Sequence, residues 1–238
     1  MAKCEIGIKN IENALERLKN GWGKNILKKT SFYETQRGIY ISPKQGVRMK
    51  IKEVMNQVKR SYERNLANTY PSWGHLGFVE RNQTFNFCSQ YEKLFNNPKL
   101  SIWQEVNLNE TREHMDSLIV DGDTAYLIEA KRLQSEKSVK AIEEDMVRME
   151  KIVKKSAESE DGVLCGLKHA KKIVYVILAD FWLPRQKGRA KKLAHRESFD
   201  MLCQKYDYKT IFSEEILAGG TAPVSDAEEY HLICVMKS

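Results

Sequence analysis

Charged side chains interrupt two short apolar runs in MDSLIVDGDTAYLIEAKRL, residues 115–133. Asp116 lies in the first run, and Glu129 and Lys131 lie in the second. Charges within apolar strands are costly unless they are paired or bind a ligand. Two carboxylates from adjacent strands repel each other, and a hard divalent cation relieves that repulsion. A nearby lysine can orient a water or neutralise a phosphate oxygen. The expected chemistry is metal-assisted hydrolysis of a phosphodiester.

The Asp121-Gly122 pair predicts a two-residue hairpin turn, because a type I′ turn needs positive φ at both positions. This turn places Asp116 opposite Leu127. Glu129 then shares a face of the sheet with Asp116 on the diagonal, and Lys131 lies two residues further along that face. A three-residue turn would send Asp116 to the other face. The turn therefore predicts that the three charged residues gather together.

The acid-x-Lys pattern alone is weak support for a site. It also occurs at Asp207-Tyr208-Lys209, after an expected helix and without a hairpin. The prediction of a site therefore depends on the position of Asp116 and on the hairpin. The alternative is a surface salt bridge between Glu129 and Lys131, with Asp116 merely exposed to solvent.

The surrounding pattern predicts a mixed α/β arrangement of layers around one sheet. From residue 75 the expected order is helix, three strands, helix, strand, helix and strand. Their ranges are 75–96, 100–108, 114–120, 124–130, 133–156, 172–183, 186–205 and 230–237. Helices are also expected at 5–29 and 52–67, with a turn-rich stretch containing short strand-like runs at 38–51. A loop at 69–77 divides a basic, mostly helical N-terminal extension, 1–70, from a core, 71–238.

Asp116, followed after a hairpin by Glu129-Ala130-Lys131, resembles the D…(D/E)-x-K signature of the PD-(D/E)xK nuclease superfamily. Met115 stands where the usual proline would precede the aspartate. The resemblance covers about residues 75–183 and implies a restriction-endonuclease-like core of order α-β-β-β-α-β, with a mixed central sheet flanked by helices. It implies that Asp116 and Glu129 hold Mg²⁺ or Mn²⁺. Lys131 would position a water, or help to deprotonate it if its pKa is depressed.

Members of this superfamily often add a glutamate from the helix before the three strands, and Glu80 is the preferred candidate for this catalytic and metal-binding role. It shares the expected sheet-facing stripe, whereas Glu92 lies off that stripe and is expected to be solvated. Pairing of Glu80 with a nearby base or with backbone groups is the alternative. Glu105 and His114 are additional candidates near the site.

The net charge of +7 and pI near 9.0 suggest a polyanionic partner. The segment 184–196 holds six lysines and arginines and no acid. We expect contacts to the DNA backbone from this segment and from the helix at 52–67, although each group could equally be a solvated helix face. The candidates are Lys187, Arg189, Lys191, Lys192, Arg60 and Arg64.

The preferred function is a Mg²⁺-dependent DNA endonuclease of the type II restriction class, acting as a homodimer. A repair or mobile-element nuclease of the same fold and a catalytically inactive nucleic-acid-binding protein are the alternatives. The five cysteines contain no C-x-x-C pair, which favours a reducing, cytoplasmic setting. No apolar run approaches the length of a membrane helix, and the start does not read as a signal peptide.

Overall fold

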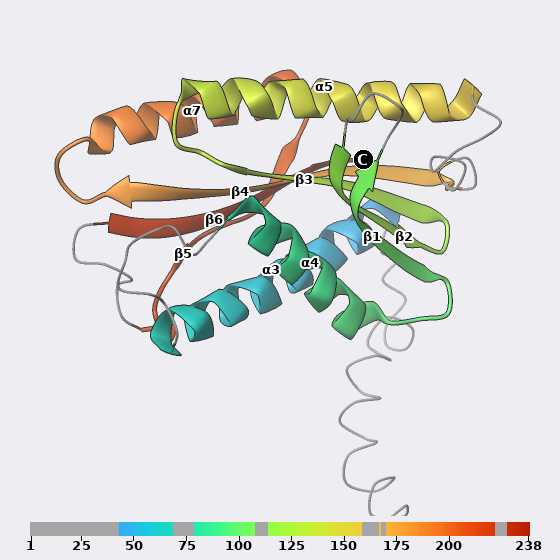
Figure 1. Cartoon of the computed structure of the whole chain (residues 1–238), viewed down its shortest axis with the longest axis horizontal. Helices are drawn as coiled ribbons and strands as arrows, with labels where there is room; N and C mark the ends of the chain where they lie inside the picture. Colours follow the sequence, from blue (N-terminus) through green and yellow to red (C-terminus); the bar gives the residue numbers. More distant parts are fainter. Residues whose placement is uncertain (1–42, 69–78, 108–113, 159–166, 168–169, 222–227) are drawn as a thin grey trace, which may run out of the picture. The chain divides into compact units, whose positions relative to one another are not determined.

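The structure is a computed structural model that describes residues 43–68, 79–107, 114–158, 167, 170–221 and 228–238. Within these residues a six-stranded mixed sheet lies between two helical layers, as Figure 1 shows. Helices α3 and α4 pack on one face, and helices α5 and α7 pack on the other. The expected mixed α/β class is therefore confirmed. The helix expected at 5–29 and the loop at 69–77 lie outside the described residues.

The order of elements from residue 80 agrees with the expectation up to α7. The elements are α4 (Glu80–Phe95), β1 (Leu100–Asn107), β2 (His114–Asp121), β3 (Thr124–Arg132), α5 (Glu136–Glu158), β4 (Lys172–Pro184) and α7 (Arg189–Lys205). Two strands follow, β5 (Lys209–Ile216) and β6 (Glu228–Lys237). The strand order in the sheet is β1-β2-β3-β4-β6-β5. Only the β3–β4 pair is parallel, because α5 provides the crossover between these strands.

Helix α3 (Pro43–Asn68) begins well before the expected helix at 52–67. The expectation of a turn-rich stretch with strand-like runs is therefore wrong for residues 43–51. Proline is well tolerated in the first helical turn, and Val47 and Ile51 extend the buried face of the helix. Helix α3 packs against α4 and β5 and belongs to the compact unit Pro43–Ser238. The proposed boundary after residue 70 remains a prediction.

Strand β5 was not expected from the sequence. Its residues, KTIFSEEI, include three charged side chains, and only Phe212 and Ile216 are buried. The strand lies at the edge of the sheet and pairs only with β6. Because an edge strand is largely solvated, its apolar residues are too few to give a clear alternating pattern.

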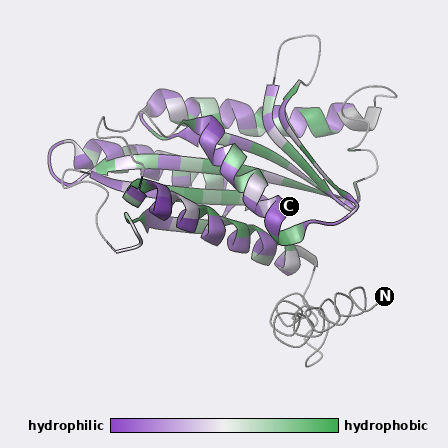
Figure 2. Cartoon of the chain, turned by 60° about the horizontal axis from the view of Figure 1, so that its bottom comes forward, coloured by the Kyte–Doolittle hydropathy of each residue, from purple (hydrophilic) through white to green (hydrophobic). Residues whose placement is uncertain are grey.

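Side chains from the two faces of the sheet form two apolar cores. In β3, Tyr126, Ile128 and Ala130 pack toward α3 and α4, whereas Ala125 and Leu127 pack toward α5 and α7. Figure 2 shows hydrophobic residues concentrated along the strands, whereas the helices carry both hydrophilic and hydrophobic residues. Glu129 follows Leu127 on the α5 side, so the apolar core is interrupted by a charged group at this point.

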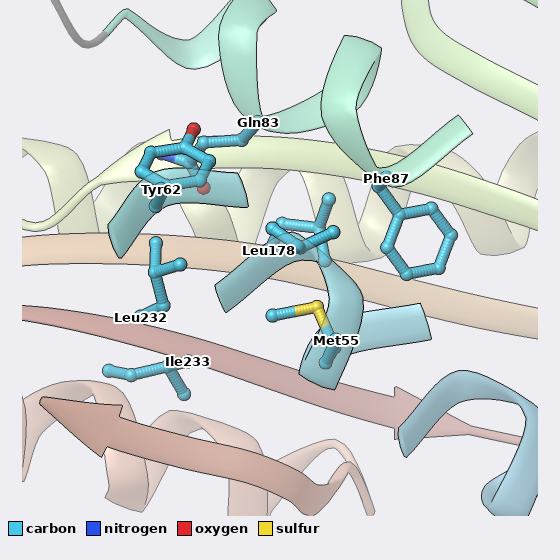
Figure 3. Close-up of a pocket in the computed structure, with 8 residues that line it drawn as sticks. Met55, Tyr62, Gln83, Phe87, Leu178, Leu232 and Ile233 are labelled. Atoms are coloured by element: carbon cyan, nitrogen blue, oxygen red, sulfur yellow. The ribbon is translucent and has the colours of Figure 1, made fainter. Parts of the chain in front are cut away.

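A small cavity lies between α3, α4 and the sheet. Figure 3 shows Tyr62 and Gln83 on one side of it and Phe87 and Leu178 on the other. Its volume is about 10 Å³, which is room for one water at most. This cavity is therefore too small to be a substrate pocket.

The β2–β3 hairpin has a two-residue turn, but the turn comprises Gly122 and Asp123 rather than Asp121 and Gly122. Asp121 pairs with Thr124 as the last residue of β2. Its carboxylate accepts hydrogen bonds from Lys50 at 2.9 Å, Tyr91 at 2.8 Å and Asn97 at 3.0 Å. These contacts fix Asp121 at the strand end and move the turn by one residue.

The displaced turn shifts the expected register by two residues. Leu127 lies opposite Leu118, and not opposite Asp116 as expected. An even shift preserves the face on which each side chain lies. The paired residues end at Ser117 and Ile128, so Asp116 and Glu129 are each the next residue beyond the last pair. The two carboxylates are close enough that the charge of Asp116 raises the pKa of Glu129.

Two glycines provide opposite tests of the backbone. Gly122 has a φ of +58°, so Gly122→Ala is expected to lower the free energy of unfolding by about 1–2 kcal/mol.

Gly46 lies within α3 with open space around its Cα, so Gly46→Ala is expected to raise the free energy of unfolding by about 0.5–1 kcal/mol. Urea denaturation of both variants measures the two values. Equal stability of Gly122→Ala and the wild type would contradict the turn geometry.

Candidate active site

Asp116 lies where β2 separates from β3. The paired residues of these strands end at Ser117 and Ile128. Beyond that pair, the Asp116 carboxylate accepts a hydrogen bond of 2.7 Å from the backbone N–H of Ala130. A side-chain oxygen thus satisfies a strand N–H that the separated neighbour no longer bonds. This bond fixes the Asp116 carboxylate beside the backbone between Glu129 and Lys131.

Glu129 is buried, with 1% of its surface exposed, on the side of β3 that faces α5. Its Oε1 lies 2.6 Å from a guanidinium nitrogen of Arg148. Burial, and after it the negative charges of Asp116 and Asp145, raise the pKa of Glu129 to about 8, although Arg148 opposes the shift. An additional positive charge at this position would stabilise the carboxylate.

Lys131 lies between acids from both helical layers. Its Nζ is 3.3 Å from Oδ2 of Asp145 on α5 and 3.9 Å from Oε2 of Glu80 on α4. Burial by itself lowers the pKa of Lys131, but the surrounding acids, Asp145 first, raise it above its ordinary value. A depressed pKa, which would let Lys131 help to deprotonate the water, is therefore not found in this structure. Lys131 is a protonated hydrogen-bond donor.

Glu80 is the first residue of α4 and approaches the end of β3. Its Oε1 accepts a hydrogen bond of 3.0 Å from the backbone N–H of Arg132. The side chain contacts the end of β3, but it is 45% exposed and so less buried than the expected inward-facing position implies. It reaches Lys131 around the end of the strand. Glu92 is exposed, as expected.

Two charged residues of the site, Asp145 and Arg148 on α5, were not identified from the sequence. They form an ion pair of 2.8 Å, three residues apart on one helix face. Asp145 is only 4% exposed. The available signal was an acid beside Ile142 and Met146 on the apolar stripe of the helix, the same kind of signal that selected Glu80.

Glu105 and His114 lie next to this group but make no hydrogen bond or ion pair with Asp116, Glu129 or Lys131 in the described residues. Glu105 is exposed and forms an ion pair of 3.1 Å with Arg81. Its φ of +52° is unusual for a residue other than glycine, and it occupies the β1 position opposite Asp116. His114 is exposed at the start of β2.

The cluster has an excess of negative charge. When every carboxylate is counted as ionised, the formal charge is −2, from Glu80, Asp116, Glu129 and Asp145 against Lys131 and Arg148. Carboxylate oxygens are the ligands that Mg²⁺ prefers, so the donor set and its charge fit that ion. In the described residues, however, no three acidic, histidine or cysteine side chains are grouped to hold a metal. Arg148 occupies the Glu129 carboxylate instead.

The six candidate phosphate-binding residues fall into two groups. Arg60, Arg64, Lys187 and Lys191 are exposed and make no hydrogen bond or ion pair with another described residue. Arg189 pairs with Glu229 at 3.1 Å, and Lys192 donates a hydrogen bond of 3.0 Å to the carbonyl of Gln134. Arg189 and Lys192 are thus engaged within the protein.

The Lys192 contact places the first turn of α7 beside the chain that leaves β3. Gln134 follows Lys131 by three residues. Lys191 and Lys187 belong to the same turn and the loop before it, so they lie near the end of β3 that carries Lys131.

Comparison with protein-family models, with curated proteins and with solved structures found no match to this chain. Among the described helices, none has the length and apolar character needed to cross a membrane.

Proposed function

We propose that this protein is a Mg²⁺-dependent endonuclease that hydrolyses DNA phosphodiester bonds, with the restriction-endonuclease-like core of the PD-(D/E)xK superfamily. The observation that carries this proposal is the cluster around the end of β3. Asp116, Glu129 and Lys131, which resemble the superfamily signature, lie with Glu80 in a group with formal charge −2. The element order α4-β1-β2-β3-α5-β4 supports the same proposal.

Asp116 and Glu129 would hold the metal ion, with Glu80 as a further oxygen ligand. When bound, Mg²⁺ polarises the scissile phosphate and lowers the pKa of an attacking water. Asp116 is already fixed by the Ala130 N–H. One oxygen of Glu129, Oε1, is occupied by the 2.6 Å ion pair with Arg148, so the ion would bind the other oxygen or take the place of Arg148.

Lys131 acts as a charged donor in this mechanism. Its ammonium group, held by Asp145 and Glu80, donates a hydrogen bond to the attacking water or to a non-bridging phosphate oxygen. The positive charge stabilises the negative charge that develops on the phosphate during attack. The surrounding acids raise the pKa of Lys131, which favours a role in orienting the water over a role in removing its proton.

We propose a type II restriction endonuclease acting as a homodimer on DNA, since two sites are needed to cut two strands. The test incubates the full chain with plasmid DNA and Mg²⁺, with EDTA and single-stranded RNA as parallel samples. Discrete DNA fragments in Mg²⁺ alone are expected. A smear of fragments would indicate the repair or mobile-element alternative. Binding to DNA without cleavage in Mg²⁺ or Mn²⁺ would contradict the nuclease and favour the inactive binding protein.

The exposed cations predict a specific change in the salt dependence of DNA binding. Each phosphate contact contributes a slope of about −0.9 to the plot of log K against log salt. Arg60→Ala with Arg64→Ala, or Lys187→Ala with Lys191→Ala, is expected to reduce the magnitude of the slope by about 1.8. Fluorescence anisotropy over a salt series measures it. Lys171→Ala is the matched control, because Lys171 is exposed but paired with Asp123 at 2.7 Å. An unchanged slope in either double variant would exclude that pair from the interface.

A further inference from the structure

Asp145 connects the two cations of the candidate site. Its Oδ2 lies 3.3 Å from Nζ of Lys131, and its Oδ1 lies 2.8 Å from the guanidinium of Arg148. Each of these cations also contacts a signature or candidate acid, Glu80 for Lys131 and Glu129 for Arg148. One carboxylate on α5 therefore links the two strand residues Glu129 and Lys131 to the helix.

The position of Asp145 is fixed by packing. Asp145 is 4% exposed, and its neighbours on the helix, Ile142, Met146 and Met149, are fully buried in the core between α5 and the sheet. A carboxylate on such a face is anchored by the helix around it, so its partners are held in turn. Lys131 has a long flexible side chain, and an anchored counter-charge restricts where its ammonium group can lie.

We propose that Asp145 is a positioning residue for the nuclease reaction, which orients Lys131 toward the scissile phosphate and retains Arg148 when Glu129 takes up the metal. This inference rests on the proposed function. If metal binding displaced Arg148 from Glu129, its 2.8 Å ion pair with Asp145 would hold the guanidinium on α5 and keep it from competing for the Glu129 carboxylate. In this proposal Asp145 acts only through Lys131 and Arg148.

The variant Asp145→Asn keeps the shape of the side chain and removes its charge. Loss of a group that orients an active-site residue typically costs about 10–100-fold in activity. We expect kcat for plasmid cleavage to fall at least about tenfold, with KM for DNA and the dissociation constant for Mn²⁺ changed by less than about threefold. Glu144→Gln is the matched control, because Glu144 is the adjacent acid on the same helix and makes only an exposed 4.0 Å pair with Lys140.

A double-mutant cycle separates positioning from a general structural role. If Asp145 acts through Lys131, then Asp145→Asn in the Lys131→Met background is expected to lower the rate by less than about threefold. An equal loss in both backgrounds would overturn the proposal. So would full activity of Asp145→Asn, or a more than tenfold loss of Mn²⁺ affinity measured by calorimetry, which would make Asp145 a ligand.

The role of Asp145 can still be tested if Asp145→Asn does not fold, and its failure can be told apart from failure of the proposed function. If Asp145→Asn does not fold, Asp145→Glu keeps the charge but displaces the carboxylate by about one methylene group. It is then expected to lower kcat with unchanged Mn²⁺ affinity, and full activity would overturn the proposal. Failure of the proposed function is distinguishable, because the wild type itself would then neither cleave DNA nor bind Mn²⁺ at this site. A cleaving wild type with an unaffected Asp145→Asn overturns only the role of Asp145.

Discussion

Replacing Lys131 by methionine is expected to lower the rate of Mg²⁺-dependent DNA cleavage about 10²–10³-fold, the usual loss when one preorganised donor to a transition state is removed. Methionine retains much of the length of lysine without its ammonium group. The metal-binding carboxylates Asp116 and Glu129 are unchanged in this variant, so the dissociation constant for Mn²⁺ is expected to remain within a few-fold of the wild type. Single-turnover cleavage kinetics and calorimetry measure the two quantities.

The chain contains a matched control for this experiment. Lys209 stands two residues after an acid, like Lys131, but it forms an exposed 2.7 Å ion pair with Asp207 at the edge of the sheet. Lys209→Met is expected to leave cleavage unchanged. Comparable losses in Lys131→Met and Lys209→Met would indicate a general effect of lost positive charge on DNA binding, and would contradict a catalytic role for Lys131.

Replacing Arg132 by methionine is expected to produce the largest loss of stability. The Arg132 guanidinium lies 3.3 Å from Asp180, whose side chain is completely buried and also accepts a 3.0 Å hydrogen bond from Tyr230. Removing one partner of a buried ion pair typically costs about 3–5 kcal/mol, because the other charge is left without compensation. We therefore expect a loss of that size in the free energy of unfolding near pH 8.

The size of this loss is expected to depend on pH. Burial raises the pKa of Asp180 to about 6, although Arg132 and Tyr230 oppose the shift. The charged form of Asp180 is disfavoured in the folded protein, so it lowers the free energy of unfolding at pH values above its folded pKa. This loss of stability is relieved as the pH falls toward the ordinary pKa of an aspartate. Loss of Arg132 raises the folded pKa further. The difference in stability between wild type and Arg132→Met is therefore expected to be larger at pH 8 than at pH 5.

Urea denaturation at the two pH values tests this expectation. Arg185→Met is the control, because Arg185 makes only surface ion pairs of 3.4 and 3.6 Å and is expected to change stability by less than about 1 kcal/mol. An equal loss for Arg132→Met at both pH values would mean that Asp180 is not the group left uncompensated.

Local patterns predicted much of the fold around β3. The Asp-Gly pair located the hairpin, and the continuous apolar run in 172–183 identified β4 as a central strand. The turn itself was misplaced by one residue, because the contacts of Asp121 with Lys50 and Tyr91 come from other elements and are invisible to a local pattern. Since the shift is even, the paired residues from Ser117 to Asp121 keep their predicted faces, whereas Asp116 lies beyond the last pair and its face stays a prediction.

The missed parts of the candidate site share one physical cause. Asp145 and Arg148 join the site only because α5 packs over β3. This packing brings Asp145 close to Lys131 and Arg148 close to Glu129, although the partners are far apart in the sequence. Glu80 was selected from the expected buried stripe, but its half-exposed side chain lies at the first residue of α4 and contacts the end of β3. Periodicity identifies which face a residue occupies, but it does not identify the partner that the residue meets there.

The central claim is that Asp116, Glu129 and Lys131 form a metal-dependent phosphodiesterase site. Its most direct test compares the initial rate of plasmid cleavage in Mg²⁺ by the wild type and by Asp116→Asn, with folding of both checked by circular dichroism. We predict metal-dependent cleavage by the wild type and a loss of about 10²-fold or more in Asp116→Asn. Cleavage that continues at the wild-type rate in Asp116→Asn, or an inactive wild type, would contradict the claim.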